Sequence, residues 1–243
     1  MVLAVIPARF ASTRFPGKPL VMIQGKSMVQ RVYEQVLQVP DIQEVWVATD
    51  DARILEHVHA FGGKAVLTRA EHSSGTDRCA EVCQLFPEAE WVLNIQGDEP
   101  FVQPEQIQRL LQTIQSGSSG IATLAKKIDD PHLLTNPNSV KVVVNQLGHA
   151  LYFSRHPIPY IRGSEPTDWL EQDLHYKHIG LYAFRRSTLL EIAQLPTSLL
   201  ETAESLEQLR WLDNGYTIQV GLTDLETIGI DSPEDLERVA LLS

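Results

Sequence analysis

The sequence predicts an α/β fold built on a mixed, mostly parallel sheet with helices on both faces. Short apolar runs alternate with amphipathic segments through the first half of the chain, which is typical of repeated strand–helix units. The loops between them are short, which favours parallel strands joined by covering helices. Two later apolar runs flank residues 145–148 and predict an antiparallel hairpin, so the sheet is mixed. We expect one domain over residues 1–243, because no linker or repeat divides the chain.

The first half of the chain contains four predicted strands, each followed by a helix. Ser27 is a suitable N-cap for the first helix, and Asp50 or Asp51 for the second. Pro104 is expected to open the last of these helices, because proline is favoured in the first turn. The predicted strands are residues 1–6, 45–49, 65–68 and 91–95, and the helices start at Met28, span 52–61 and 76–86, and start at Pro104.

The second half breaks this alternation. Residues 154–176 lack periodicity and are predicted to form a long irregular segment, and long ordered loops are often functional. Ser232, Pro233 and Asp235 are predicted to cap a final helix that runs to Leu242. The remaining predicted elements are strands at 121–125, 140–144, 150–153, 178–184 and 217–220 and helices at 187–195 and 203–212.

Composition and charge exclude several classes of protein. The net charge of −11 argues against nucleic acid or an anionic membrane as the main partner. No apolar run reaches the length that spans a membrane, and the first residues do not resemble a signal peptide. The two cysteines, Cys79 and Cys83, lie four residues apart in a predicted helix and are interpreted as buried apolar side chains. These features predict a cytoplasmic protein.

The loop after the first strand reverses the sign of the chain's charge. It carries Arg9, Arg14 and Lys18 among small residues, and no acidic residue precedes Glu34. A loop between the first strand and the first helix is a common ligand site in α/β sheets. Clustered cations and small residues suit phosphate oxygens, so the loop predicts a polyanionic ligand, most plausibly a triphosphate. The alternative is a basic turn that pairs with the protein's own acidic residues.

Asp98 follows the fourth predicted strand and lies in a turn at the same sheet edge as this loop. An aspartate there often serves only as a turn former or helix cap. A bound triphosphate would require Mg²⁺, which proteins hold with one or two carboxylates together with phosphate oxygens and water. Asp98 is therefore a candidate ligand of Mg²⁺, and Asp231 is one of several candidates for a second carboxylate.

For two further groups of polar residues, the sequence does not decide between a structural role and a binding role. Residues 73–78 begin a predicted helix, and Ser74 or Thr76 can either cap it or contact a base. His178 lies in a predicted strand and is more simply a structural residue. The sequence contains no recognisable nucleophilic dyad or triad.

Taken together, seven segments resemble the 3-deoxy-manno-octulosonate cytidylyltransferase family. Each is modest evidence, but they occur in order along nearly the whole chain. The resemblance implies a Rossmann-like nucleotide-diphospho-sugar transferase fold with a nucleotide-binding half at about 1–125 and a sugar-binding and dimerisation region at about 140–225. The matching segments are residues 6–20, 74–78, 96–100, 150–155, 177–182, 203–210 and 231–236.

The resemblance also implies a reaction and its partners. CTP and 3-deoxy-manno-octulosonate (Kdo), an acidic eight-carbon sugar, would give CMP-Kdo and pyrophosphate for lipopolysaccharide biosynthesis. The enzyme would be a cytoplasmic homodimer that uses Mg²⁺, with dimer contacts from about 179–212.

The same resemblance assigns roles to individual residues. The triphosphate would be held by Arg9, Arg14 and Lys18, with Ala8 and Ser12 lining the same loop. The catalytic residues would be Arg14, Lys18, Asp98 and Asp231, the last two as Mg²⁺ ligands. Cytosine and ribose would contact Ser74, Gly75, Thr76 and Arg78. The sugar pocket would contain Gln96, Arg155, His178, Tyr182, Glu207 and Gln208.

These assignments agree with the chemistry of nucleotidyl transfer. The 2-hydroxyl of the sugar would attack the α-phosphorus in line, and the basic loop and Mg²⁺ would stabilise the departing pyrophosphate. The absence of a nucleophilic dyad is therefore expected. The sequence departs from the family pattern at Phe10, Phe15, Leu199 and Glu226, and the last change affects the expected geometry around Asp231.

Three other functions compete with this interpretation. A cytidylyltransferase for 8-amino-Kdo or sialic acid would differ only in its sugar pocket. A nucleotide-binding protein without turnover would not require Asp98, Asp231, Arg14 and Lys18. A glycosyltransferase of similar fold would commonly carry an Asp-x-Asp metal motif, and this sequence has none.

Overall fold

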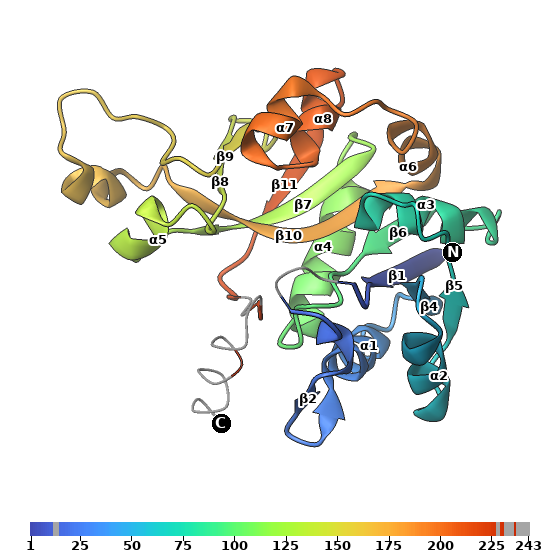
Figure 1. Ribbon diagram of the computed structural model, residues 1–243. Coiled ribbons are helices and arrows are strands. Elements are labelled where there is room, and N and C mark those ends of the chain that lie inside the picture. The colour runs from blue at the N-terminus through green and yellow to red at the C-terminus, as the bar shows by residue number, and fades with distance from the viewer. Residues whose placement is uncertain (12–14, 227–228, 231–235, 237–243) are drawn as a thin grey trace. The chain divides into compact units, whose positions relative to one another are not determined.

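The computed structural model describes residues 1–11, 15–226, 229–230 and 236 of the chain. It contains two compact units, and neither is a continuous stretch of sequence (Figure 1). Unit 1 consists of residues 1–108, 185–193 and 227–243, and unit 2 of residues 109–184 and 194–226. These boundaries differ from the halves at about 1–125 and about 140–225, because two later segments return to unit 1.

The sheet of unit 1 is parallel, as its sequence pattern predicts. Its strands lie in the order β6-β1-β4-β5, and β1 pairs in parallel with β4 and β6 while β4 pairs in parallel with β5. Residues 3–6 of β1 are fully buried, since this strand has neighbours on both edges and helices on both faces. The strands are β1 (Val2–Ala8), β4 (Glu44–Thr49), β5 (Ala65–Leu67) and β6 (Trp91–Asn94).

Helices cover both faces of this sheet. The chain crosses from β1 to β4 and on to β5 in one direction and returns to β6 in the other, so right-handed crossovers place α1 and α2 on one face and α3 on the opposite face. Ser27 caps α1 and Asp51 caps α2, each as the sequence predicts. The helices are α1 (Met28–Leu37), α2 (Ala52–Ala60), α3 (Gly75–Gln84), α6 (Arg186–Ile192) and α4 (Pro104–Ser116), which begins in unit 1 and ends in unit 2.

The sequence pattern does not predict a short hairpin and a 3-10 turn that lie between β1 and α1. The turn η1 (Lys18–Leu20) follows the basic loop, and strands β2 (Met22–Ile23) and β3 (Lys26–Ser27) pair antiparallel. Gln24 and Gly25 both have positive φ angles, which is the geometry of a tight two-residue hairpin turn. Strands of two residues are too short for an alternating pattern to reveal.

Unit 2 supplies the mixed part of the architecture. β7 pairs in parallel with β11 and antiparallel with β10, and the predicted hairpin is present as β8 and β9. The prediction of a mixed, mostly parallel sheet with helices on both faces is thus confirmed. The strands are β7 (Ile121–Lys127), β8 (Lys141–Val144), β9 (Ala150–Ser154), β10 (Tyr176–Arg185) and β11 (Ile218–Leu222), and the short helices are α5 (Pro131–Thr135), η2 (Pro166–Gln172), α7 (Leu199–Glu204) and α8 (Gln208–Asp213).

Two predictions for the second half are wrong in detail. The single helix predicted at 203–212 is two helices, because Ser205 has a φ of 51° in the left-handed region and ends α7 there. The segment 154–176 is not wholly irregular, since it contains η2, whose Trp169 packs in a buried cluster with Ile128, Leu134 and Ile161. The predicted final helix lies outside the described residues, apart from Leu236.

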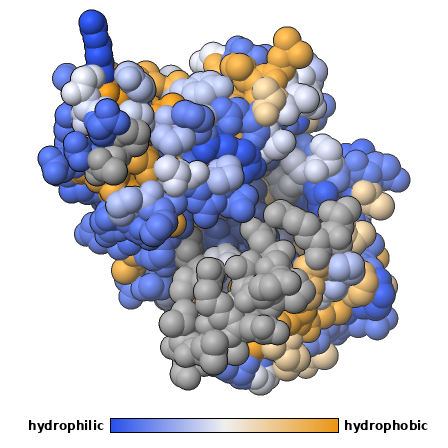
Figure 2. Space-filling view, turned by 60° about the vertical axis from the view of Figure 1, so that its left-hand side comes forward, coloured by the Kyte–Doolittle hydropathy of each residue, from blue (hydrophilic) through white to orange (hydrophobic). Residues whose placement is uncertain are grey.

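None of the helices in the described ranges is long and apolar enough to cross a membrane. On the face shown in Figure 2, hydrophobic residues are interspersed with hydrophilic ones.

Candidate active site

The candidate nucleotide site lies at the carboxyl edge of the unit 1 sheet. Because the strands are parallel, the loops that follow β1, β5 and β6 emerge at this one edge. Ala8 is the last residue of β1 and is buried, and Arg9 follows it. Ser74 and Gly75 begin α3 after the loop that follows β5, and Gln96 and Asp98 follow β6.

Two glycines allow these loops to approach the end of β1 closely. A Cβ atom on Gly97 would lie 2.7 Å from the carbonyl oxygen of Pro7, a distance that side chains do not reach. A Cβ atom on Gly75 would lie 3.3 Å from Cγ of Pro7. The turn after β6 and the start of α3 therefore both touch Pro7, next to Ala8 and Arg9.

Lys18 and Asp98 form the central ion pair of this edge. Lys18 Nζ lies 2.9 Å from Asp98 Oδ2, and 9% of the lysine side chain and 45% of the aspartate side chain are exposed. A buried ammonium group paired with a half-exposed carboxylate leaves one side of the pair open to a ligand. The structure thus joins two predicted catalytic residues that are 80 positions apart in the sequence.

The segment before Asp231 also reaches Asp98. The amide of Ile230 donates a hydrogen bond of 3.3 Å to the carbonyl oxygen of Asp98. The Ile230 side chain is fully buried and packs against Ile23 and Met28, which anchors the segment in unit 1. Asp231 itself lies outside the described residues, as do Ser12 and Arg14.

The described ends of the basic loop contact each other. The amide of Gly17 donates to the carbonyl of Phe10 at 2.9 Å, and Gly17 has a φ of 72°, which favours glycine. The Arg53 guanidinium carbon lies 3.3 Å from the centre of the Phe10 ring. Arg53 also pairs with Asp51, so one cation links the start of α2 to the basic loop.

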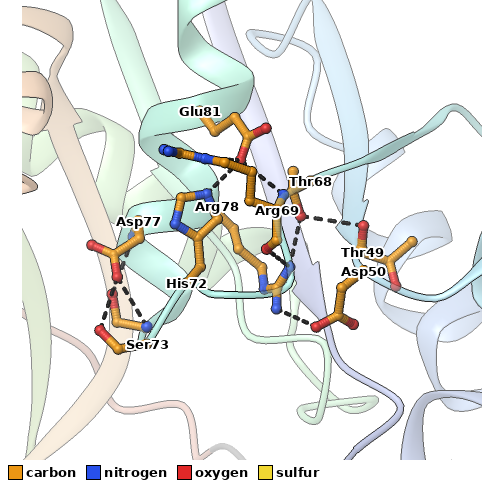
Figure 3. A network of polar contacts seen from close by, with 10 residues as sticks. Thr49, Asp50, Thr68, Arg69, His72, Ser73, Asp77, Arg78 and Glu81 are labelled. Atoms are coloured by element: carbon orange, nitrogen blue, oxygen red, sulfur yellow. Dashed lines mark hydrogen bonds and ion pairs between the residues drawn. The ribbon is translucent and has the colours of Figure 1, made fainter.

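Arg78 is a buried link between two loops of the candidate site (Figure 3). Its Nη2 donates to Asp50 Oδ2 at 2.5 Å, and its Nη1 donates to Thr68 Oγ1 at 2.7 Å and to the carbonyl of Arg69 at 3.2 Å. The side chain is fully buried. In this arrangement the guanidinium fixes the loops after β4 and β5, and its predicted contact with cytosine or ribose stays a prediction.

The start of α3 is a capping box. Ser74 Oγ accepts a hydrogen bond from the amide of Asp77, and the Asp77 carboxylate accepts one from the amide of Ser74 (Figure 3 shows Asp77 beside Ser73). Thr76 is buried. The hydroxyl of Ser74 thus has the capping role that the sequence left open, and nucleotide contacts from Ser74, Gly75 and Thr76 stay predictions.

The donor set at this edge fits Mg²⁺. Among the described residues, no group of three or more His, Cys, Asp or Glu side chains could hold a metal ion. Magnesium in nucleotide sites needs fewer protein ligands, because phosphate oxygens and waters complete its octahedron. A half-exposed Asp98 carboxylate supplies a hard oxygen of the required type.

Five of the six predicted sugar-binding residues belong to unit 2, and Gln96 belongs to unit 1. His178 and Tyr182 lie on β10 with ring centres 5.4 Å apart. Glu207 is the N-cap of α8, and Gln208 is its buried first residue. Burial lowers the pKa of His178 to about 3, so the ring is neutral, and burial followed by the nearby Glu207 raises the pKa of Tyr182.

Arg155 is bound by the end of α7. Its Nε and Nη2 donate to the carbonyls of Glu204 and Ser205 at 2.7 and 3.3 Å, and its Nη1 donates to the carbonyl of Pro137 at 3.0 Å. The Glu204 carboxylate accepts from the amide of Arg155 at 2.9 Å. Arg155 therefore satisfies carbonyls at the end of a helix, and its predicted contact with the sugar stays a prediction.

A buried cation, Lys141, binds the backbone at Arg155. Lys141 Nζ donates to the carbonyl of Arg155 at 2.6 Å and to that of Asn136 at 3.0 Å. Burial, with the positive charge of Arg155 nearby, lowers the pKa of Lys141 to about 8.

Sequence reasoning misses several residues that position this site. The sequence indicates Asp50 or Asp51 as a helix cap, but Asp51 caps α2 and Asp50 pairs with Arg78. Arg53 belongs to no motif that would mark it, and Glu204 lies in the matching segment 203–210 but has no role assigned from the sequence. The position of Asp50 at the end of a strand, at the same edge as Arg9, is the signal that could have identified it.

Comparison with known proteins finds relatives over nearly the whole chain. The profile of a family described as cytidylyltransferase matches residues 3–220. A 3-deoxy-manno-octulosonate cytidylyltransferase from Cytophaga hutchinsonii is 56% identical over 98% of this chain and 96% of that protein. One from Parabacteroides distasonis is 57% identical over 97% of this chain and 95% of that protein.

Solved structures give the same result. A CMP:2-keto-3-deoxy-manno-octonic acid synthetase complexed with CTP superimposes with a TM-score of 0.91 at 47% identity and covers 99% of this chain and 97% of that chain. A 4-diphosphocytidyl-2C-methyl-D-erythritol synthase from Anaerococcus prevotii has a TM-score of 0.65 at 15% identity over 99% of this chain and 97% of that chain, which shows a shared fold.

We predict that Arg78→Lys destabilises the protein by about 2 kcal/mol, because lysine lacks the planar fork that reaches Asp50 and Thr68 together. Urea unfolding measures the change. Arg53→Lys is the matched control, since its pair with Asp51 is exposed, and should leave the unfolding midpoint near that of the parent. An Arg78→Lys variant of unchanged stability and weakened CTP binding would contradict the structural role and favour direct contact with the nucleotide.

Proposed function

This chain belongs to the cytidylyltransferase family, and from that premise we propose that it transfers CMP from CTP to the 2-hydroxyl of Kdo, with release of pyrophosphate. The observation that carries the proposal is the contact of Lys18 with Asp98 at the carboxyl edge of the unit 1 sheet. In this proposal Lys18 binds phosphate and Asp98 binds the metal ion, and their ion pair supports a shared site for both. We also propose that the product serves lipopolysaccharide biosynthesis.

The basic loop binds the triphosphate in this proposal. Arg9 and Lys18 lie at its two ends, and Arg14 lies between them in the sequence. Guanidinium and ammonium groups held in place before the reaction stabilise the charge that develops on the leaving pyrophosphate. Because the sugar hydroxyl attacks the α-phosphorus directly, no covalent intermediate with the protein is required.

We propose that Asp98 and Asp231 hold Mg²⁺, which neutralises phosphate charge when bound. The half-exposed Asp98 carboxylate and the hydrogen bond from Ile230 to the Asp98 carbonyl support this pairing. Lys18 keeps the Asp98 carboxylate in position before the nucleotide arrives.

Sugar recognition is proposed for the predicted residues of unit 2, and Gln96 of unit 1 stays a predicted sugar-binding residue. The neutral His178 and the buried Tyr182 and Gln208 offer hydrogen-bonding groups that suit hydroxyls. The alternative sugars, 8-amino-Kdo and sialic acid, would present different groups to these residues. The assay of pyrophosphate release described below compares all three sugars.

We further propose that the enzyme is a cytoplasmic homodimer. Leu199 and Leu200 of α7 lie within the expected dimerisation segment at 179–212, and 88% and 38% of their surfaces are exposed. Two adjacent exposed leucines add apolar surface of the kind that contacts between subunits bury. The two cysteines are free and buried, which suits a reducing compartment.

The first test measures pyrophosphate release with CTP and Mg²⁺ for Kdo, 8-amino-Kdo and sialic acid. We expect the highest kcat/KM with Kdo, because the relatives named 3-deoxy-manno-octulosonate cytidylyltransferase are 56% and 57% identical over nearly the whole chain. Reactions without sugar are the control for CTP hydrolysis. Release with sialic acid alone would contradict the choice of sugar, and no release with any of the three would contradict the enzyme itself.

Asp98→Asn is expected to lower kcat about 100-fold or more and to raise the Mg²⁺ concentration needed for half-maximal rate, because the amide is a poor metal ligand. Calorimetric titration with Mg²⁺ and CTP gives a readout independent of turnover. Asp51→Asn, which keeps the cap of α2, is the control and should retain most of the activity. Near-normal turnover of Asp98→Asn would make the metal assignment wrong.

Leu199→Asp is expected to shift the protein from dimer to monomer in size-exclusion chromatography with light scattering, since a charge would be buried in the proposed interface. Leu147→Asp is the control, because Leu147 is 76% exposed and lies outside the dimerisation segment. A parent protein that is monomeric at micromolar concentration would refute the homodimer.

A further inference from the structure

The pairing of β10 with β7 is interrupted beside His178. The register shifts between Ile179 and Tyr182, so Gly180 and Leu181 have no partner residues on β7. Such a bulge leaves backbone carbonyls without their ladder hydrogen bonds. The fully buried side chain of Thr123, on β7, occupies this position.

Thr123 Oγ1 makes three hydrogen-bonding contacts at the bulge, and the buried hydroxyl of Tyr182 also interacts with the Thr123 side chain. Thr123 Oγ1 lies 2.8 Å from the carbonyl oxygen of Leu181, 3.1 Å from that of Ile179 and 2.9 Å from Nε2 of His178. A hydroxyl has one proton to donate and two lone pairs that accept. Both carbonyl oxygens are acceptors, so the Thr123 proton is shared between them and is closest to Leu181.

The histidine must therefore donate to Thr123. If Thr123 instead donated to Nε2, its lone pairs would face two buried carbonyl oxygens without a proton between them, which is unfavourable at 2.8 and 3.1 Å. The favourable arrangement has the proton of a neutral ring on Nε2. Neutrality follows from burial, which lowers the pKa of His178 to about 3.

The other ring nitrogen is then an acceptor. Among the described residues, Nδ1 of His178 has no hydrogen-bond partner, and part of the His178 surface stays exposed although the ring is covered enough for burial to lower its pKa. Phe153 and Tyr182 pack against its ring at 5.0 and 5.4 Å between centres, which limits rotation. A neutral Nδ1 accepts a hydrogen bond from a hydroxyl or an amine, whereas it is repelled by a carboxylate.

We propose that Thr123 is a positioning residue that fixes the Nε2–H tautomer of His178, so that Nδ1 accepts a hydrogen bond from a hydroxyl group of the sugar. This inference rests on the proposed function for the identity of the sugar, but the tautomer itself does not depend on it. It assigns His178 to a hydroxyl of the substrate and leaves the carboxylate to cationic or amide groups.

The first test reads the tautomer directly in the parent protein. Long-range ¹H–¹⁵N correlation spectra separate protonated from unprotonated ring nitrogens, and the loss of signals in His178→Gln identifies the ring. We expect the protonated nitrogen at Nε2 over about pH 5–8, because the pKa of the ring lies below this range. A protonated Nδ1 would overturn the proposal, and this measurement requires neither turnover nor a folded Thr123 variant.

The second test separates positioning from stability. Thr123→Val removes the hydroxyl and keeps the shape, and Thr123→Ser keeps the hydroxyl. We expect Val to raise KM for Kdo about tenfold, with KM for CTP unchanged, and to give a mixture of tautomers, while Ser restores both. Thr113→Val is the matched control, because Thr113 is also buried and also donates to a backbone carbonyl, that of Arg109 at 2.8 Å.

The outcomes distinguish this proposal from the proposed function. An equal rise in KM for Kdo in Thr123→Val and Thr113→Val would overturn the positioning role. If the parent releases no pyrophosphate with any sugar, the proposed function fails, while the spectrum still shows whether Thr123 sets the tautomer.

Discussion

The close contact of two loops with the end of β1 is the constraint on which the candidate site depends. Gly97 approaches the carbonyl of Pro7 so closely that any side chain there would collide with it, and Gly75 packs on the proline ring. These contacts draw the turn after β6 and the start of α3 to the strand that leads into the basic loop. Because these contacts hold the two loops close to the end of β1, Lys18 and Asp98 can form their ion pair.

Most of the fold of unit 1 could be predicted from the sequence because its signals are local. Apolar runs mark the strands, and Ser27 and Asp51 mark the helix starts, since a cap acts on amides only two or three positions away. Arg78 and Asp50 are 28 positions apart and Arg155 and Glu204 are 49 apart. No periodicity reports such contacts, so they required the tertiary structure. Ser205 shows the same limit, because a left-handed residue inside a helix-like pattern has no apolar signature.

The predicted ligand-binding residues differ in which groups of the protein their polar atoms already bind. Lys18 and Asp98 bind each other in a pair that is open to solvent on the aspartate side. Arg78 and Arg155 instead direct their guanidinium groups to carboxylate or carbonyl oxygens of the protein. A motif match identifies all four residues with equal weight. The structure separates an ion pair whose carboxylate is half exposed from groups that hold loops and helix ends in place, and only the surroundings of each side chain carry that distinction.

The interleaving of the two units limits how the protein can be divided. Residues 185–193 and 227–243 return to unit 1 after the chain has entered unit 2. A truncation after Gln108 would remove α6, whose first amide donates to the carbonyl of Glu90, and Ile230, which fills the cluster with Ile23 and Met28. A fragment made by a single cut would therefore expose apolar surface that the full chain covers. Fragment complementation or exchange of halves between relatives would need several junctions, placed where the chain crosses from one unit to the other.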